Sequence, residues 1–244
     1  MRNCLFCPNP ANSREDIWPK WILQRLRIKG PIRAEIAKTK SFVMWGPKAA
    51  HKSKCVCKTC NNGWMSALED VNIPLLGCLL RDIAMPLDRS QQEVIATWVI
   101  KTSMVTESTA HPTRQQFYSV AEREQLRTSL SIPARTSVWL GRYSGTGTIA
   151  MKGTDAWSGT ESPVAVQGYV YTILFGYLVI QSLTLHVEGE YGDTPITIHP
   201  KGHGTGCSST SGLPMAGMSS GRRPLRFATA IRPSTRLLVG TTSE

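Results

Sequence analysis

Two Cys-x-x-Cys pairs, Cys4/Cys7 and Cys57/Cys60, constrain the fold more than any other feature, and 49 residues separate them. Each pair forms a tight turn whose sulfurs reach one ion. Two such turns complete a tetrahedral zinc site with Zn–S bonds of about 2.3 Å. Cys55 also lies close, but only Cys57 has the two-residue spacing to Cys60. We therefore expect a closed, structural Cys₄ zinc site.

The cysteine content favours a reducing compartment. The chain has seven cysteines, an odd number, and Cys55, Cys78 and Cys207 lie outside the two pairs. Its first residues include no apolar signal segment, and Cys-x-x-Cys pairs in that setting favour metal over disulfides. We expect a cytoplasmic protein.

The basic charge is concentrated near the cysteines. Residues 1–60 carry 13 Lys/Arg and 3 Asp/Glu, a net charge of +10, whereas residues 61–199 carry 9 and 13, a net charge of −4. Residues 200–244 carry 6 and 1, a net charge of +5. Basic faces bind phosphate-rich partners because counterions are released. We therefore expect a nucleic acid as the partner, with DNA favoured over RNA; a merely solvated face is the alternative.

Composition divides the chain into three parts. Residues 1–85 form the expected zinc-binding module, and residues 86–199 an α-then-β C-terminal domain. Residues 200–244, rich in Gly, Ser, Pro and Arg, form an expected loosely ordered tail. His199, His203 and Cys207 lie near the start of the tail. We expect these residues to have no shared function; a second metal site is the alternative.

Local patterns predict the elements of the first two parts. Pro19 opens an expected helix over 20–28, and residues 31–54 are predicted to form a strand or hairpin. Capping-box patterns begin at Ser90 and Ser119, each with Glu three residues later, and predict two helices. From residue 134 onward, β-branched and aromatic residues predict strands. The expected fold class is α+β.

One uncharged stretch lies between Glu161 and Glu188. A membrane-spanning helix needs about 20 apolar residues. Gln167 and Gln181 interrupt this stretch, and Phe175-Gly176 lies at its centre, where two strands could meet. We expect a buried β-hairpin and no membrane partner; a transmembrane helix is the alternative.

An acidic motif follows the first cysteine pair, and an amide-rich motif follows the second. The first reads Glu15-Asp16-Ile17-Trp18-Pro19-Lys20-Trp21, and the second extends from Asn61-Asn62-Gly63-Trp64-Met65 to Glu69-Asp70. This arrangement resembles the HNH endonuclease family, which is built on a treble-clef zinc scaffold. The resemblance covers residues 4–7, 15–21 and 57–70. It implies an N-terminal ββα-metal module ahead of the helices and an antiparallel β region.

The resemblance also implies a catalytic site. Glu15 would bind a divalent ion together with Glu69 or Asp70, and Asn61 would brace the loop that carries the general base. Carboxylate and amide oxygens suit Mg²⁺ or Mn²⁺. The predicted activity is metal-dependent endonuclease cleavage of phosphodiesters, a hydrolase reaction. Phosphate contacts are expected from Lys20, Arg25, Arg27 and Lys29.

Asp16 departs from the family pattern, which has a histidine as general base at this position. An aspartate with a pKa near 3.9 is a much weaker base than a histidine with a pKa near 6.5. Three interpretations follow. Asp16 serves as the general base or as a metal ligand, or a histidine such as His51 acts as the base instead. In the third, the chain has lost cleavage. The alternative function is thus a catalytically degenerate, zinc-stabilised module that binds nucleic acid or protein.

Structural explanations compete with each catalytic role. Glu69 and Ser66 match a capping box, and Glu15 fits a solvated acid ahead of a helix. Asn61 fits a side-chain bond to the backbone. Trp18, Trp21 and Trp64 are expected to be core residues rather than base-stacking platforms.

Overall fold

A computed structural model of the chain describes residues 2–27, 32–36, 41–45, 52–110, 115–143, 149–157, 165–188 and 235–237. Helices and antiparallel sheets are both present in these residues, as the α+β prediction requires. Lys29, His51 and the cluster predicted at His199, His203 and Cys207 lie outside the described residues, as does most of the predicted tail.

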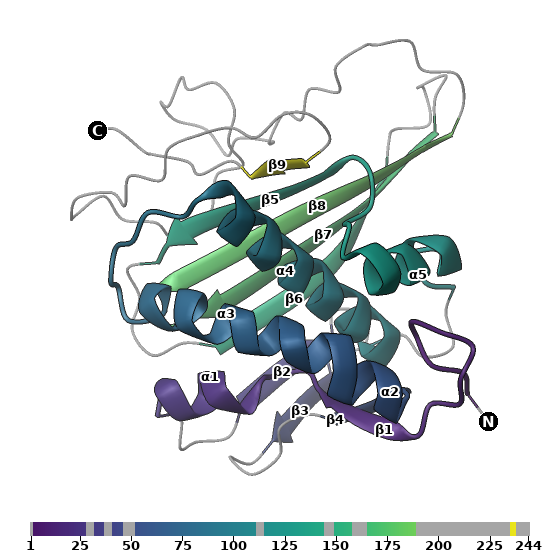
Figure 1. Ribbon diagram of the computed structural model, residues 1–244, viewed down its shortest axis with the longest axis horizontal. Helices are drawn as coiled ribbons and strands as arrows, with labels where there is room; N and C mark the ends of the chain where they lie inside the picture. The colour runs from purple at the N-terminus through teal and green to yellow at the C-terminus, as the bar shows by residue number, and fades with distance from the viewer. Residues whose placement is uncertain are drawn as a thin grey trace.

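A five-stranded sheet forms the larger β structure (Figure 1). Its order is β6-β7-β8-β5-β9, and only the β5–β9 pair is parallel. The strands are β5 (Thr136–Arg142), β6 (Ile149–Trp157), β7 (Ala165–Phe175), β8 (Leu178–Glu188) and β9 (Thr235–Leu237).

The uncharged stretch forms the β7–β8 hairpin, so the hairpin prediction is confirmed. Phe175 pairs with Leu178, and Gly176 in the turn has a φ of +56°, where a side chain would be strained. A Cβ at Gly176 would also lie 3.1 Å from the Leu80 carbonyl oxygen. Among the described residues, no helix has the length and apolar character needed to cross a membrane.

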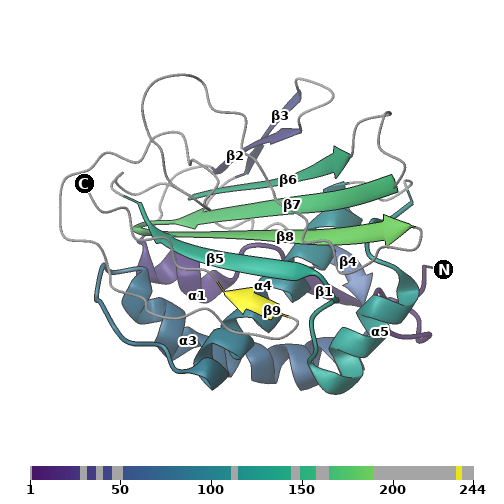
Figure 2. The same cartoon turned by 90° about the horizontal axis from the view of Figure 1, so that it is seen from above.

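The longer helices lie on one face of this sheet (Figure 2). They are α3 (Ser66–Leu79), α4 (Arg89–Ala110) and α5 (Val120–Ser129). The capping box predicted at Ser119 is confirmed, because Ser119 Oγ accepts from the Glu122 N–H and Glu122 accepts from the Ser119 N–H. The one predicted at Ser90 is wrong: Asp88 Oδ1 accepts from the Gln91 N–H at 2.9 Å, so α4 begins earlier.

The N-terminal part contains two small antiparallel pairs. β1 (Ser13–Asp16) pairs with β4 (Lys52–Val56) to form what we call the β1–β4 ribbon. β2 (Ile32–Ile36) and β3 (Ser41–Trp45) form the hairpin predicted in this region.

Short helical segments connect the ribbon to α3. α1 (Lys20–Arg25) follows Pro19, which is its N-cap rather than its first residue. This helix ends earlier than predicted, and Arg27 adopts a left-handed φ of 52°. After β4, α2 (Lys58–Cys60) and the π-type turn η1 (Asn61–Met65) continue directly into α3.

One hydrophobic cluster contains residues from both sides of position 85. Trp18 packs edge-on against Phe175, with ring centroids 5.7 Å apart. Ile22 of α1 and Ile95 of α4 are both fully buried in the same cluster. The expected boundary at residue 85 stays a prediction, but the two parts share a core.

Candidate functional site

The four paired cysteines meet in one cluster. Cys57 and Cys60 lie at the start of the helical segment that follows β4, and their Sγ atoms lie with those of Cys4 and Cys7 within 4.8 Å of one another. Cys7 Sγ is 3.6 Å from Cys57 Sγ and 3.7 Å from Cys60 Sγ. A tetrahedron with Zn–S bonds of about 2.3 Å has S–S edges of about 3.8 Å, whereas a disulfide measures about 2.05 Å. The cluster therefore fits a metal ion such as zinc.

Hydrogen bonding prepares Cys57 for metal binding. Burial opposes its thiolate, but the Cys60 N–H and the neighbouring thiols outweigh burial and lower the pKa of Cys57 to about 7. Ligand sulfurs must be deprotonated, so this environment assists a metal. Cys55 is fully buried and lies outside the cluster, and burial raises its pKa to about 11. The prediction of Cys57 rather than Cys55 is confirmed.

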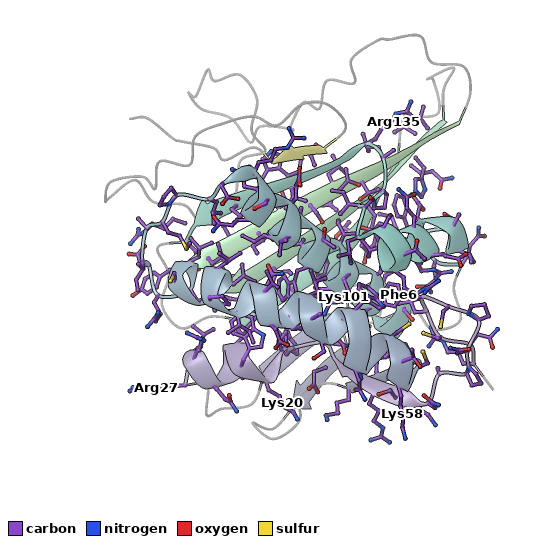
Figure 3. The ribbon with its side chains drawn as sticks, viewed as in Figure 1. Phe6, Lys20, Arg27, Lys58, Lys101 and Arg135 are labelled. Atoms are coloured by element: carbon purple, nitrogen blue, oxygen red, sulfur yellow. The ribbon has the colours of Figure 1, made fainter. Side chains whose placement is uncertain are left out.

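The predicted catalytic carboxylates Glu15 and Glu69 also meet, but a lysine lies between them. Nζ of Lys101, from α4, is 3.1 Å from Glu15 Oε1 and 2.8 Å from Glu69 Oε1. The Lys101 side chain is only 2% exposed, and it is labelled near the middle of the molecule in Figure 3. Three elements, β1, α3 and α4, thus join in one buried group, which we call the Lys101 triad.

Two indole groups complete the bonding of Glu69. Trp98 Nε1 donates to Oε1 at 2.6 Å, and Trp21 Nε1 donates to Oε2 at 2.8 Å. Both oxygens of Glu69 therefore accept from indole donors, one buried at Trp98 and one partly buried at Trp21. The capping-box explanation for Glu69 is wrong, since its carboxylate turns inward to these partners. Glu15 is 9% exposed, so it is not a solvated acid either.

The triad holds one positive charge and two negative charges, and its pKa values follow from that imbalance. Burial opposes the charge of Lys101, but Glu69 and Glu15 outweigh it and raise the Lys101 pKa. Burial likewise opposes the charge of Glu69, yet Lys101 and the bonds from Trp21 and Trp98 lower its pKa. For Glu15, burial exceeds the attraction of Lys101, so its pKa is raised. Lys101 and Glu69 are thus the firmly charged pair.

The triad does not fit the predicted Mg²⁺ or Mn²⁺ ion. Such ions take oxygen ligands at about 2.0–2.1 Å and keep several waters. The position between Glu15 and Glu69 is filled by the Lys101 ammonium group, which would repel a second cation. A divalent ion would bind there only after Lys101 had left.

Asp16 and Asp70 lie outside the triad. Asp16 is opposite Lys52 in the ribbon, and its carboxylate is 3.6 Å from Lys52 Nζ and 4.0 Å from Lys20 Nζ. Asp70 follows Glu69 on α3, and its side chain is exposed. The carboxylates that bind Lys101 in the triad are those of Glu15 and Glu69, and neither Asp16 nor Asp70 is a third member.

Asn61 connects the helical segment to β1. Its Nδ2 donates to Ser13 Oγ at 2.8 Å and to the Arg14 carbonyl oxygen at 3.2 Å. Nearby, the Lys58 N–H donates to Asn12 Oδ1 at 2.9 Å. These bonds hold β1 beside the cysteine cluster, just ahead of Glu15. A catalytic role for Asn61 stays a prediction.

Three of the four predicted phosphate contacts are exposed on or beside α1, and Lys29 lies outside the described residues. Lys20 is exposed and lies beside Asp16 in the salt-bridge pair described above. Arg25 is exposed, with its guanidinium 6.0 Å from the Trp21 ring centroid, and Arg27 is exposed beyond the end of α1. Figure 3 places Arg27 and Lys20 apart along the lower side of the molecule.

Sequence reasoning missed Lys101, although its surroundings carried a signal. Lys101 is the only charged residue between Glu93 and Glu107, in a segment that includes Val94, Trp98 and Met104. A lysine on an otherwise uncharged, core-facing helix requires a carboxylate partner, because an isolated buried charge is too costly. Glu15 and Glu69 were the available partners.

Comparisons with protein-family models, curated proteins and solved structures gave no match to this chain. The resemblance to HNH endonucleases therefore rests on the residue pattern alone.

Proposed function

We propose that this chain is a zinc-stabilised nucleic-acid-binding protein whose HNH-like acidic pair has become a structural ion-pair site. The observation that carries the proposal is the position of Lys101, with Nζ 3.1 Å from Glu15 and 2.8 Å from Glu69. The ammonium group supplies the positive charge that a catalytic ion would otherwise supply. It cannot activate water as a metal ion does.

The charge distribution supports nucleic acid as the partner. Residues 1–60 carry a net charge of +10, from 13 basic and 3 acidic residues, and include most of the zinc module. Phosphate backbones bind such surfaces in a salt-dependent manner.

We also infer a treble-clef arrangement for the zinc module, with the ββα-metal motif of the HNH family. Two features support it. The Cys4/Cys7 turn is closed by a bridge between Asn3 and Pro10, and Cys57/Cys60 lie at the start of the helical segment leading to α3. In this arrangement zinc fastens the end of the β1–β4 ribbon at which Ser13 pairs with Val56.

Plasmid nicking tests the loss of cleavage. Wild type, Glu15→Ala and the surface control Glu93→Ala are incubated with supercoiled plasmid and Mg²⁺ or Mn²⁺. We expect no nicking that depends on Glu15. Metal-dependent nicking that is lost in Glu15→Ala but kept in Glu93→Ala would restore the predicted endonuclease and overturn the structural role of the triad.

Fluorescence anisotropy with labelled DNA and RNA tests the binding itself. We expect wild type to bind with an affinity that falls steeply as salt rises. Absence of binding to every nucleic acid at low salt would reject the proposed function.

A further inference from the structure

We propose that the outer face of the β1–β4 ribbon binds the phosphate backbone of double-stranded nucleic acid. This inference rests on the proposed function and identifies the surface and the form of the ligand. The surface consists of Arg14, Lys20, Lys52, Lys54 and Lys58, which we call the ribbon cations.

Strand alternation produces this surface. Successive side chains of a strand point to opposite faces, so Glu15 and Cys55 point into the core while Arg14 and Lys54 point outward. Lys52 repeats the outward position two residues before Lys54, about 6.8 Å away at about 3.4 Å per residue. The paired strands therefore place Glu15 on the buried face and the cations, together with Asp16, on the other face.

Flanking segments extend the cationic face. Lys58 is exposed at the start of α2, and its N–H bond to Asn12 fastens it to the chain just before β1. Lys20 of α1 is 61% exposed and shares Asp16 with Lys52. Figure 3 shows Lys20 and Lys58 on the lower side of the molecule, far from Arg135. Among the five cations, Lys20 and Lys52 lie beside the Asp16 carboxylate.

The surface favours duplex over single strands. Single-strand binding uses exposed aromatic rings on which bases stack. In the described part of the module, Trp18 is 3% exposed, Trp21 is bonded to Glu69, and Trp64 packs against Phe6 with ring centroids 5.0 Å apart. These three rings pack in or against the core, which confirms the prediction for Trp18. Among the ribbon side chains that the structure describes, the cations are therefore the contact groups.

The chemistry of the cations indicates contact with phosphates rather than base reading. Four of the five are lysines, which act as point charges and lack the bidentate geometry that reads guanine. The two strands of such a ribbon lie about 5 Å apart, which is narrow enough for the ribbon to follow a major groove about 12 Å wide. Binding is therefore expected to depend on salt and little on sequence.

The experiment compares two triple variants with equal loss of charge. The test variant is Lys52→Gln/Lys54→Gln/Lys58→Gln, and the matched control is Arg81→Gln/Arg89→Gln/Arg135→Gln, which changes exposed arginines outside the ribbon. Anisotropy is measured across a salt series with a labelled 20-base-pair duplex, the corresponding single strand, and anionic phosphatidylserine vesicles as competitor. Zinc content and thermal melting confirm that both variants are folded.

We expect the test variant to bind duplex at least about tenfold more weakly, with a salt slope reduced by two to three, since each phosphate contact contributes about 0.9. The control should stay within about threefold of wild type. If wild type binds duplex and both variants weaken equally, the ribbon is not the surface, although the proposed function stands. Tighter binding to single strands, or preferential binding to vesicles, would overturn the choice of ligand. Failure of wild type to bind any nucleic acid would instead reject the proposed function.

Discussion

Nζ of Lys101 lies 2.8 Å from Oε1 of Glu69, although 31 residues separate them in the sequence. Glu69 also accepts from the indoles of Trp98 and Trp21, so its negative charge is held by three donors. A buried ammonium group is stable only when its partners compensate for lost hydration. The pair therefore links α3 to α4 more specifically than apolar packing does.

Substitutions in the triad should lower the free energy of unfolding by different amounts. Lys101→Met leaves two carboxylates without their cationic partner, and Glu69→Gln directs an amide group toward indole donors. We expect each to lower the free energy of unfolding by about 3–5 kcal/mol. Glu15→Gln should cost clearly less, because the pKa of Glu15 is already raised by burial and its amide oxygen still accepts from Lys101.

Urea unfolding at fixed zinc concentration measures these differences. Glu93→Gln, in an exposed pair with Arg89, is the control and should change stability by less than about 0.5 kcal/mol. A Lys101→Met protein as stable as this control would show that the triad contributes nothing.

The triad should also make stability depend on pH in the alkaline range. The Lys101 pKa is raised in the folded protein, mainly because Glu69 and Glu15 outweigh burial. Its stabilisation is therefore complete below the unfolded value of about 10.4 and is lost as pH rises through the folded value. Between the unfolded and the folded pKa, the folded chain binds more protons than the unfolded chain. Over this pH range the free energy of unfolding falls by at most about 1.4 kcal/mol per pH unit.

Unfolding of wild type and Lys101→Met between pH 9 and pH 11.5 tests this window. Burial raises the pKa of Tyr118 to about 12, so it also lowers stability there, but it does so in both proteins. The difference between the two curves isolates Lys101. It should shrink as pH rises, and a constant difference would contradict the assignment.

The cysteine cluster should hold one metal ion per chain. We expect elemental analysis to find about one zinc in wild type and none in Cys57→Ser/Cys60→Ser, because two of four ligands are lost. Cys55→Ala, which changes a neighbouring cysteine outside the cluster, should retain zinc. Equal zinc loss in Cys55→Ala would show that Cys55 is a zinc ligand and would contradict the four-cysteine assignment.

Asp16 should restrain nucleic-acid binding rather than assist catalysis. Its carboxylate lies within 4.0 Å of Lys20 and Lys52 and partly neutralises the ribbon cations. Asp16→Asn should therefore bind duplex severalfold more tightly, with a steeper salt dependence. Weaker binding together with lost nicking would instead identify Asp16 as the predicted base.

Local patterns predicted what local interactions determine. The Ser119 capping box and the turn at Gly176 each depend on a few neighbouring residues, and both are confirmed. The cysteine cluster joins residues 50 apart, but the spacing of the pairs predicted it because two thiolate pairs can share one metal ion. At the start of α4, Asp88 and Ser90 were both suitable caps, and the sequence pattern favoured the wrong one.

The content of the acidic site could not be predicted in the same way. The motif indicated that Glu15 and Glu69 carry out related roles, and they do share one partner. That partner is 86 residues from Glu15, and its position depends on how α4 packs across α3 and β1. Side-chain contacts at such separation follow from tertiary packing, which a motif does not describe.

The separation between Glu15 and Lys101 has a consequence for synthesis on the ribosome. Cys60 emerges well before Lys101, so the four thiols are available for zinc while Glu15 still lacks its ammonium partner. The carboxylate pair is complete once Glu69 has been made, and at about 5–20 residues per second the 32 residues from there to Lys101 take roughly 2–6 s to be translated. During that interval the nascent chain exposes a carboxylate pair to the cellular pool of free cations.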